Sequence, residues 1–152
     1  MVDIIHRVGI KAPASQVYEA LATVVGVAGW WTTETCGDSS VGGKMTARFS
    51  SPSGEQMGGF DWDVVELTSQ QRVLWRVTDG PEEWVGTDID FRLSEEDDYT
   101  IVKFGHRNWR EEVDFMGHCS TKWATFLLSL RDVVETGKGR PAPYDLKIDS
   151  WN

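Results

Sequence analysis

Cysteine, positive charge and long apolar runs are all scarce in this chain of 152 residues. Its two cysteines, Cys36 and Cys119, are too few for the multi-bridge framework of a small secreted domain. No apolar run approaches the roughly 18 residues that predict a membrane span. The N-terminus also lacks the basic and apolar segments of a signal peptide. We therefore expect a reduced, cytoplasmic protein.

The charge balance is strongly acidic. Lys and Arg number 15 against 24 Asp and Glu, which gives a net charge of −9 and a sequence pI near 4.7. Such a field repels phosphate backbones and anionic lipid headgroups. We therefore expect no nucleic-acid partner and no membrane partner.

Tryptophan, by contrast, is abundant. Eight Trp occur in a chain whose composition is otherwise that of an ordinary globular protein, 40% hydrophobic and 26% charged. The length fits one domain spanning residues 1–152. So many indole rings indicate either a large aromatic interior or a pocket with aromatic walls.

Hydrophobic periodicity predicts an α+β order of elements. A strand is expected over residues 2–11, then a short helix opening at Ala12–Ser15, then a second short helix or turn near Trp30 and Trp31. After a loop at 37–43, alternating patterns and turn residues predict five antiparallel strands. Their approximate bounds are Lys44–Ser50, Gln56–Leu67, Arg72–Thr78, Trp84–Leu93 and Tyr99–Trp109.

The alternation within these strands gives the predicted sheet two unlike faces. Trp62 and Phe104 fall on an apolar face, whereas Asp61 and Asp63 fall on a charged face where cross-strand ion pairs are expected. The segment from about Glu112 to Thr136 has apolar residues at three- and four-residue steps and no Pro. It predicts a long helix that covers the apolar face and ends at Gly137.

This order resembles the helix-grip superfamily known as START-like, Bet v 1-like or SRPBCC. Within it, the chain resembles the branch of the C-terminal domain of the activator of the heat-shock-protein-90 ATPase. The residues that carry the resemblance are Trp30-Trp31, Val41-Gly42-Gly43, Arg72-Val73-Leu74-Trp75, Trp84-Val85-Gly86-Thr87, Phe91, Val102-Lys103-Phe104-Gly105-His106, Trp123 to Leu130 and Glu135 to Gly139. The resemblance implies a curved antiparallel sheet of about six strands wrapped around the C-terminal helix, with a cavity between them.

The residues alone leave a solid core and a pocket equally open, and the resemblance favours the pocket. Aromatic walls with a few polar groups are typical of a small-molecule site. The alternation of the strands and the periodicity of the helix place eight side chains on the faces expected to line this cavity. They are Trp62, Trp75, Thr87, Phe91, Phe104, His106, Cys119 and Trp123.

No cofactor is expected. The loop from Asp38 to Met45 imitates a phosphate-binding loop, but it begins with Asp, ends with Met and precedes a strand. No set of residues has metal-ligand spacing, and His118 is expected at the surface. His106 on the apolar face is interpreted as a partly buried histidine that donates to a backbone carbonyl or anchors the helix, in preference to a catalytic one, because no partner group is identifiable.

Three functions follow as alternatives. The first is binding of a hydrophobic or aromatic small molecule in the cavity. The second is an enzyme of polyketide-cyclase or hydrolase type using the same cavity, although no catalytic set is identified. The third is a co-chaperone-like interaction module. A chaperone partner is less favoured, because the co-chaperone resembled has an additional N-terminal domain and this chain begins at the first predicted strand. A homodimer is compatible with all three.

Overall fold

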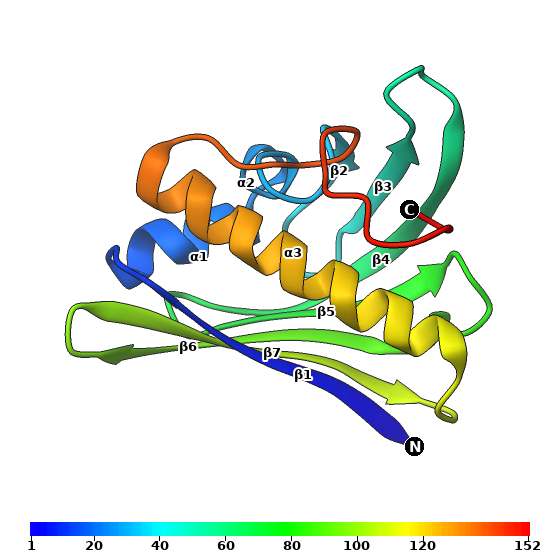
Figure 1. Ribbon diagram of the computed structural model, residues 1–152. Coiled ribbons are helices and arrows are strands. Elements are labelled where there is room, and N and C mark those ends of the chain that lie inside the picture. Colours follow the sequence, from blue (N-terminus) through cyan, green and yellow to red (C-terminus); the bar gives the residue numbers. More distant parts are fainter.

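A computed structural model describes residues 1–152 and shows a seven-stranded antiparallel sheet curved around one long helix (Figure 1). The strands follow the order β1-β7-β6-β5-β4-β3-β2 across the sheet. Their bounds are β1 Val2–Ile10, β2 Glu34–Gly37, β3 Lys44–Ser50, β4 Gln56–Thr68, β5 Arg72–Asp79, β6 Asp88–Glu96 and β7 Tyr99–Trp109. The helices are α1 Ala14–Ala22, α2 Val24–Ala28 and α3 Asp114–Thr136. The predicted helix-grip fold is confirmed.

Strand pairing brings the N-terminal strand beside the last strand of the sheet. β2 to β7 form a meander of sequential neighbours, whereas β1 pairs with β7, with Val8 opposite Val102. The pairing of β4 with β5 shifts register twice, between Asp61 and Trp62 and between Val64 and Glu66. Such irregularities bend a strand and increase its twist, which helps the sheet curve around α3.

Two strands differ from the sequence-based expectation. β2 was not predicted, because only Thr35 of its four residues is buried and so little alternation is visible. β6 begins at Asp88, four residues later than expected, because residues 84–87 form a turn in which the Thr87 amide donates to the Trp84 carbonyl at 2.9 Å. Val85 is therefore 48% exposed, and Trp84 is buried in its place.

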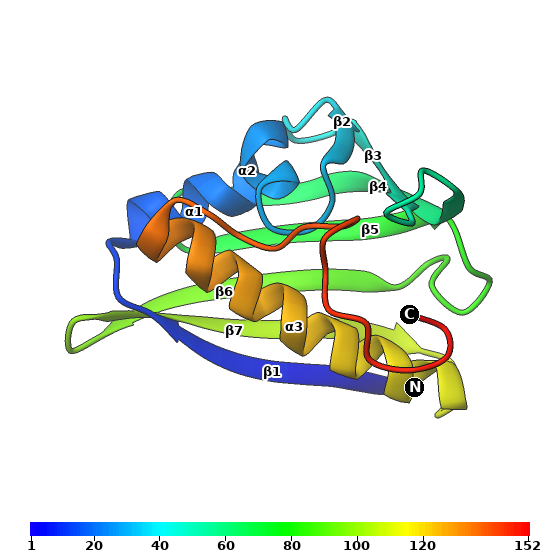
Figure 2. The ribbon, with the colours of Figure 1, turned by 45° about the horizontal axis from the view of Figure 1, so that its top comes forward.

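The long helix α3 covers the concave face of the sheet. Its buried side includes Met116, Cys119, Trp123, Phe126 and Leu130, which recur at three- and four-residue steps. It ends at Gly137, whose φ of 85° is left-handed and whose amide donates to the Val133 carbonyl at 2.9 Å. Figure 2 shows α1 and α2 on the same side of the sheet, beside the C-terminal end of α3.

The opposite face of the sheet carries the expected lattice of ion pairs. Arg48 contacts Asp61 and Lys44 contacts Asp63, each at 2.9 Å, and Arg76 contacts Asp88 at 2.8 Å. No helix of the structure has the length and apolar character needed to cross a membrane.

Candidate functional site

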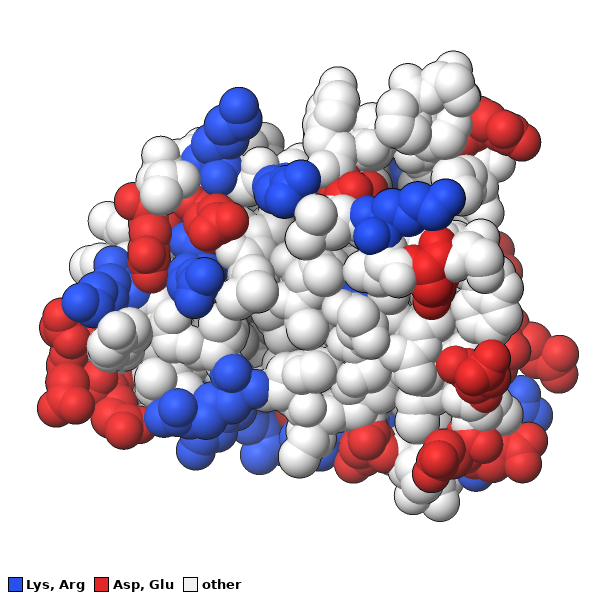
Figure 3. Space-filling view, in the orientation of Figure 1, with Lys and Arg blue, Asp and Glu red and all other residues white.

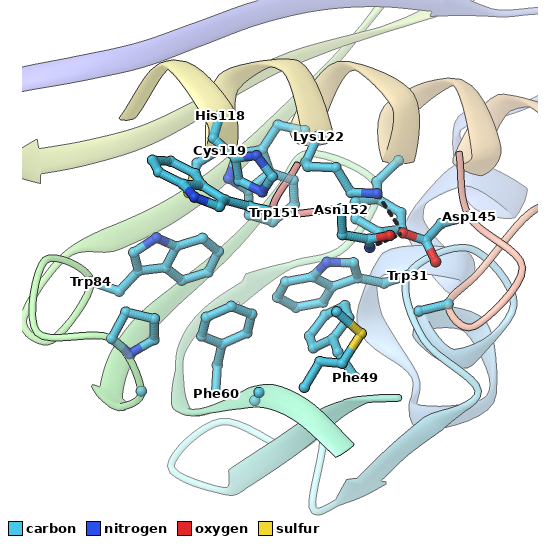
Figure 4. A pocket seen from close by; sticks show the side chains of 18 of the residues that line it. Trp31, Phe49, Phe60, Trp84, His118, Cys119, Lys122, Asp145, Trp151 and Asn152 are labelled. Carbon is cyan, nitrogen blue, oxygen red and sulfur yellow. Dashed lines mark hydrogen bonds and ion pairs between the residues drawn. The ribbon is translucent and has the colours of Figure 1, made fainter. Parts of the chain in front are cut away.

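A pocket of about 410 Å³ opens between α3, the β3–β4 hairpin, the loop after β5 and the C-terminal tail, defined here as residues 137–152 (Figure 4). Its volume lies within the range of small-molecule sites. α3 supplies one wall with six residues whose spacing places them on one helix face: Phe115, His118, Cys119, Lys122, Trp123 and Phe126.

Aromatic rings form the wall opposite α3. Trp84 stacks on Phe60 with ring centroids 3.9 Å apart and planes 6° from parallel. Trp31 stacks on Phe60 at 5.9 Å, and Phe49 meets Trp31 edge-on at 5.7 Å. These side chains lie on the far side of the pocket from His118 and Lys122 in Figure 4. The rings support one another, so the wall is an extended apolar surface suited to a flat ligand.

A buried hydrogen-bond chain behind the pocket wall holds the Trp123 indole in place. Trp123 Nε1 donates to His106 Nδ1 at 3.1 Å, and His106 Nε2 lies 2.8 Å from Thr87 Oγ1. Thr87 Oγ1 in turn donates to the Trp84 carbonyl at 2.5 Å. Since Nδ1 accepts, the proton of the neutral imidazole is on Nε2, which donates to Thr87. The chain joins Trp123 on α3 to the loop that carries Trp84.

Burial determines the protonation of His106 and Cys119. Desolvation lowers the pKa of His106 from 6.5 to about 3, so the ring is neutral near pH 7. Burial likewise raises the pKa of the Cys119 thiol to about 12, opposed weakly by the neighbouring Trp84 indole. Cys119 is therefore a protonated, apolar part of the wall and a poor nucleophile.

The C-terminal tail closes one side of the pocket. Ala142 anchors it: its amide donates to the Trp31 carbonyl at 2.9 Å, and its carbonyl accepts from the Thr33 amide at 3.0 Å. Beyond this point, Asp145 pairs with Lys122 of α3 and accepts from Asn152 Nδ2 at 3.2 Å (Figure 4). Ala142, Asp145, Trp151 and Asn152 all line the pocket. Residues far apart in the sequence thus share one site.

A histidine–carboxylate pair lies at the rim. His118 Nδ1 is 2.7 Å from Asp149 Oδ2, and the hydrogen bond from His118 is the largest cause that lowers the pKa of Asp149. The imidazole stacks on Phe115 at 6.0 Å and meets Trp151 edge-on at 5.4 Å. His118 was expected at the surface, but its side chain is only 12% exposed because the tail folds over it.

The structure separates the residues expected to line the cavity into three groups. Cys119 and Trp123 line the pocket. Thr87 and His106 lie behind its wall, in the hydrogen-bond chain described above. The others interdigitate in the core with at most 1% of their surface exposed: Trp62, Trp75, Phe91 and Phe104. Tight ring packing, with Trp62 and Trp75 centroids 4.9 Å apart, fills the space where part of the cavity was expected.

Most of the observed lining was not identified from the sequence. Trp84 was placed on a strand, although Gly80, Pro81 and Gly86 around it were a signal for a loop. The tail has no periodicity, so Asp145, Asp149 and Trp151 gave no signal of a role. Whether any of the eight expected residues contacts a ligand stays a prediction.

Charge around the pocket is unevenly distributed. Figure 3 shows mostly uncharged residues in the middle of the face that carries α3, with acidic and basic side chains around its margins. No three His, Cys, Asp or Glu side chains are grouped so that they could hold a metal ion. The site thus offers an apolar interior, a histidine with a carboxylate partner and a paired lysine.

Comparisons with known proteins agree with this fold. The family model described as "Activator of Hsp90 ATPase homolog 1-like protein" matches residues 11–135. A search of curated protein sequences gave no match. Among solved structures, the solution structure of the Aha1 dimer from Colwellia psychrerythraea is 43% identical, with a TM-score of 0.77. The match covers 91% of this chain and 100% of that one.

More distant structures share the fold. Protein SSP2350 from Staphylococcus saprophyticus is 17% identical with a TM-score of 0.72, over 93% of this chain and 98% of that chain. CalU16 from Micromonospora echinospora is 21% identical with a TM-score of 0.68, over 89% of this chain and 77% of that chain. At these identities the likeness concerns the fold alone.

Proposed function

Because this chain belongs to the family of Activator of Hsp90 ATPase homolog 1-like proteins, a family whose helix-grip fold it shares, we propose that its pocket binds a hydrophobic, aromatic small molecule. The observation that carries the proposal is the wall of stacked rings around a space of about 410 Å³. Stacked rings offer apolar area and favourable faces to a flat ligand. The neutral, buried His106 and Cys119 keep the interior free of charge on that side.

Direct binding of an aromatic dye tests this proposal. Anilinonaphthalene sulfonate, whose fluorescence rises in apolar surroundings, is titrated with the folded protein, and saturable binding is expected. Gly58→Trp should weaken binding by about tenfold or more. Gly58 lines the pocket, shares the strand face of Phe60, and a Cβ there would meet no atom within 4 Å. The added indole therefore fills the pocket without straining the backbone.

Ser94→Trp is the matched control. Ser94 is exposed on β6 and is not part of the pocket, so the same added ring should leave dye affinity unchanged. Equal binding by the unchanged chain and Gly58→Trp, or no saturable binding at all, would overturn the proposal. A native mass spectrum of freshly purified protein would further show whether a hydrophobic molecule accompanies it.

A chaperone partner is the second candidate, and the name of the 43% identical relative favours it. If it applies, adding this chain to a chaperone of the Hsp90 class should accelerate its ATP hydrolysis. An unchanged hydrolysis rate at saturating protein would exclude the activating role. That relative was solved as a dimer, which supports a homodimer here as well, and light scattering of the purified chain measures its mass directly.

A further inference from the structure

The rim of the pocket holds a histidine whose orientation is fixed and whose second nitrogen is free. A carboxylate only accepts hydrogen bonds, so the 2.7 Å contact with Asp149 requires the proton of neutral His118 to lie on Nδ1. Nε2 then carries a lone pair and has no hydrogen-bond partner in the protein. Phe115 and Trp151 restrict the ring on two sides. A base held in one tautomer by a carboxylate is the arrangement used for proton abstraction.

A cation lies next to this base. Lys122 follows His118 by four residues on α3, so the two side chains share one helix face, and both line the pocket. The ammonium group of Lys122 has three donors. Asp145 accepts from one and the Leu146 carbonyl, at 2.7 Å, from another. One N–H therefore remains for a ligand, beside the Phe126 ring, whose centroid is 5.1 Å from Nζ.

We propose that His118, oriented by Asp149, is a general base that removes a proton from the carbon between the ring and the carbonyl group of an arylmethyl ketone bound in the pocket. Lys122 Nζ stabilises the negative charge that develops on the carbonyl oxygen. The inference rests on the proposed function, because the substrate has to occupy the aromatic pocket. The stacked rings select the aryl group, and the polar rim receives the carbonyl end.

The step is balanced without any further reactant. His118 Nε2 takes the proton, and the electron pair of the C–H bond becomes the second bond between the two carbons. The carbonyl π pair moves to oxygen, where the Lys122 N–H donates to it. Return of a proton from His118 to carbon restores the ketone, so nothing is oxidised or reduced. In heavy water the returned atom is deuterium, which makes the reaction observable with the ketone alone.

Exchange of phenylacetone in heavy water tests the inference. The benzylic proton signal is followed by nuclear magnetic resonance with the folded protein, and with imidazole at equal concentration as reference. We expect the protein to accelerate exchange by roughly a hundredfold, the lower end of what a positioned general base contributes. His118→Gln should reduce the rate to the reference level. His6→Gln should keep it, because His6 bonds to the Ser120 carbonyl and lies outside the pocket.

Asp149→Asn tests whether Asp149 orients His118 or only stabilises the fold. Asp149 does not touch the substrate, so it is a positioning residue, and its loss should slow exchange while dye binding stays the same.

Binding of phenylacetone is measured in parallel by quenching of tryptophan fluorescence, so that the two proposals fail separately. If the unchanged chain binds the ketone but exchanges no faster than imidazole, or if His118→Gln exchanges as fast, the catalytic inference is overturned and the binding pocket stands. If no variant binds the ketone or the dye, the proposed function fails, and the inference fails with it.

Discussion

Three buried side chains link α3 to the sheet by hydrogen bonds between their polar atoms, in addition to ring packing. Trp123, His106 and Thr87 form a chain that ends on a backbone carbonyl, and none is more than 2% exposed. Buried polar groups are costly unless they are paired, so each member depends on the next. The consequence is a fixed orientation for the indole of Trp123, which is also a pocket wall.

The depressed pKa of His106 predicts acid sensitivity. The unfolded chain takes up this proton near pH 6.5 and the folded chain only near pH 3, so acid favours unfolding between these values. The free energy of unfolding should therefore fall as pH drops from about 6.5 towards 3, with no contribution from His106 above that window. Denaturant unfolding at several pH values, compared with His106→Gln, measures this. Parallel pH curves for the two proteins would contradict the prediction.

Trp123 should contribute to both stability and binding. Trp123→Ala removes a ring that contacts Trp31 and Phe104, with centroids 5.1 and 4.6 Å away, and should cost about 3–5 kcal/mol. Trp123→Phe should lower the free energy of unfolding by less. It still leaves His106 Nδ1 without its hydrogen-bond donor, which should cost about 1–3 kcal/mol. Dye affinity should fall in both. A stability loss with unchanged dye affinity would place the ligand elsewhere.

At the scale of elements, α3 and the C-terminal tail together build the site. The helix presents one face to the core and, towards its N-terminal half, a row of residues to the pocket. The tail then runs back along the helix and is tied to it by Lys122–Asp145 and His118–Asp149. The end of α3 at Gly137 allows the chain to reverse, so the C-cap indirectly places the tail.

Replacement of glycine by alanine should have opposite effects on stability within α3 and at its C-terminal end. Gly137→Ala should destabilise by about 1–2 kcal/mol, because φ is 85° there and a Cβ is strained in the left-handed region. Gly117→Ala should stabilise by about 1 kcal/mol, because Gly117 lies within α3 and its added Cβ would meet no atom within 4 Å. Thermal or denaturant unfolding of both variants checks the signs. A stabilising Gly137→Ala would contradict the left-handed helix end, and a destabilising Gly117→Ala would contradict the open space at that position.

At the scale of the molecule, one aromatic cluster serves as both core and pocket wall. Trp31 contacts Trp62, Trp75 and Trp123 on its inner side and lines the pocket as well. The core is thus continuous with the site, and a ligand would complete ring packing that begins in the interior. The chain achieves this without grouping potential metal ligands.

Folding should accordingly be independent of metal ions. Dialysis of the protein against a strong chelator is expected to leave its melting temperature unchanged, because a structural metal would add its binding free energy to stability. Calorimetry before and after dialysis measures this. A drop of many degrees, restored by one particular cation, would reveal a site that the grouping of side chains does not show.

The sequence by itself determined the architecture. The two-residue alternation of β4, β5 and β7 and the helical periodicity of α3 report burial directly, because local geometry decides which side chains share a face. Gly137 marked the end of α3 for the same reason, since a left-handed residue is needed there. The same alternation predicted the ion pairs on the charged face of the sheet, opposite the face that α3 covers. β2 and the start of β6 escaped, where few residues are buried or where a turn breaks the pattern, and the second short helix, expected near Trp30 and Trp31, lies at Val24–Ala28.

Tertiary structure alone decided where the pocket lies and which groups meet in it. Strand phase brought Trp62, Trp75, Phe91 and Phe104 to one face, but phase does not tell whether rings interdigitate or leave a void, because that depends on packing in three dimensions. His118 and Asp149 are 31 residues apart and have no shared periodicity. They meet because the tail, anchored at Ala142, folds back along α3, and no local pattern in the sequence encodes a contact of that kind.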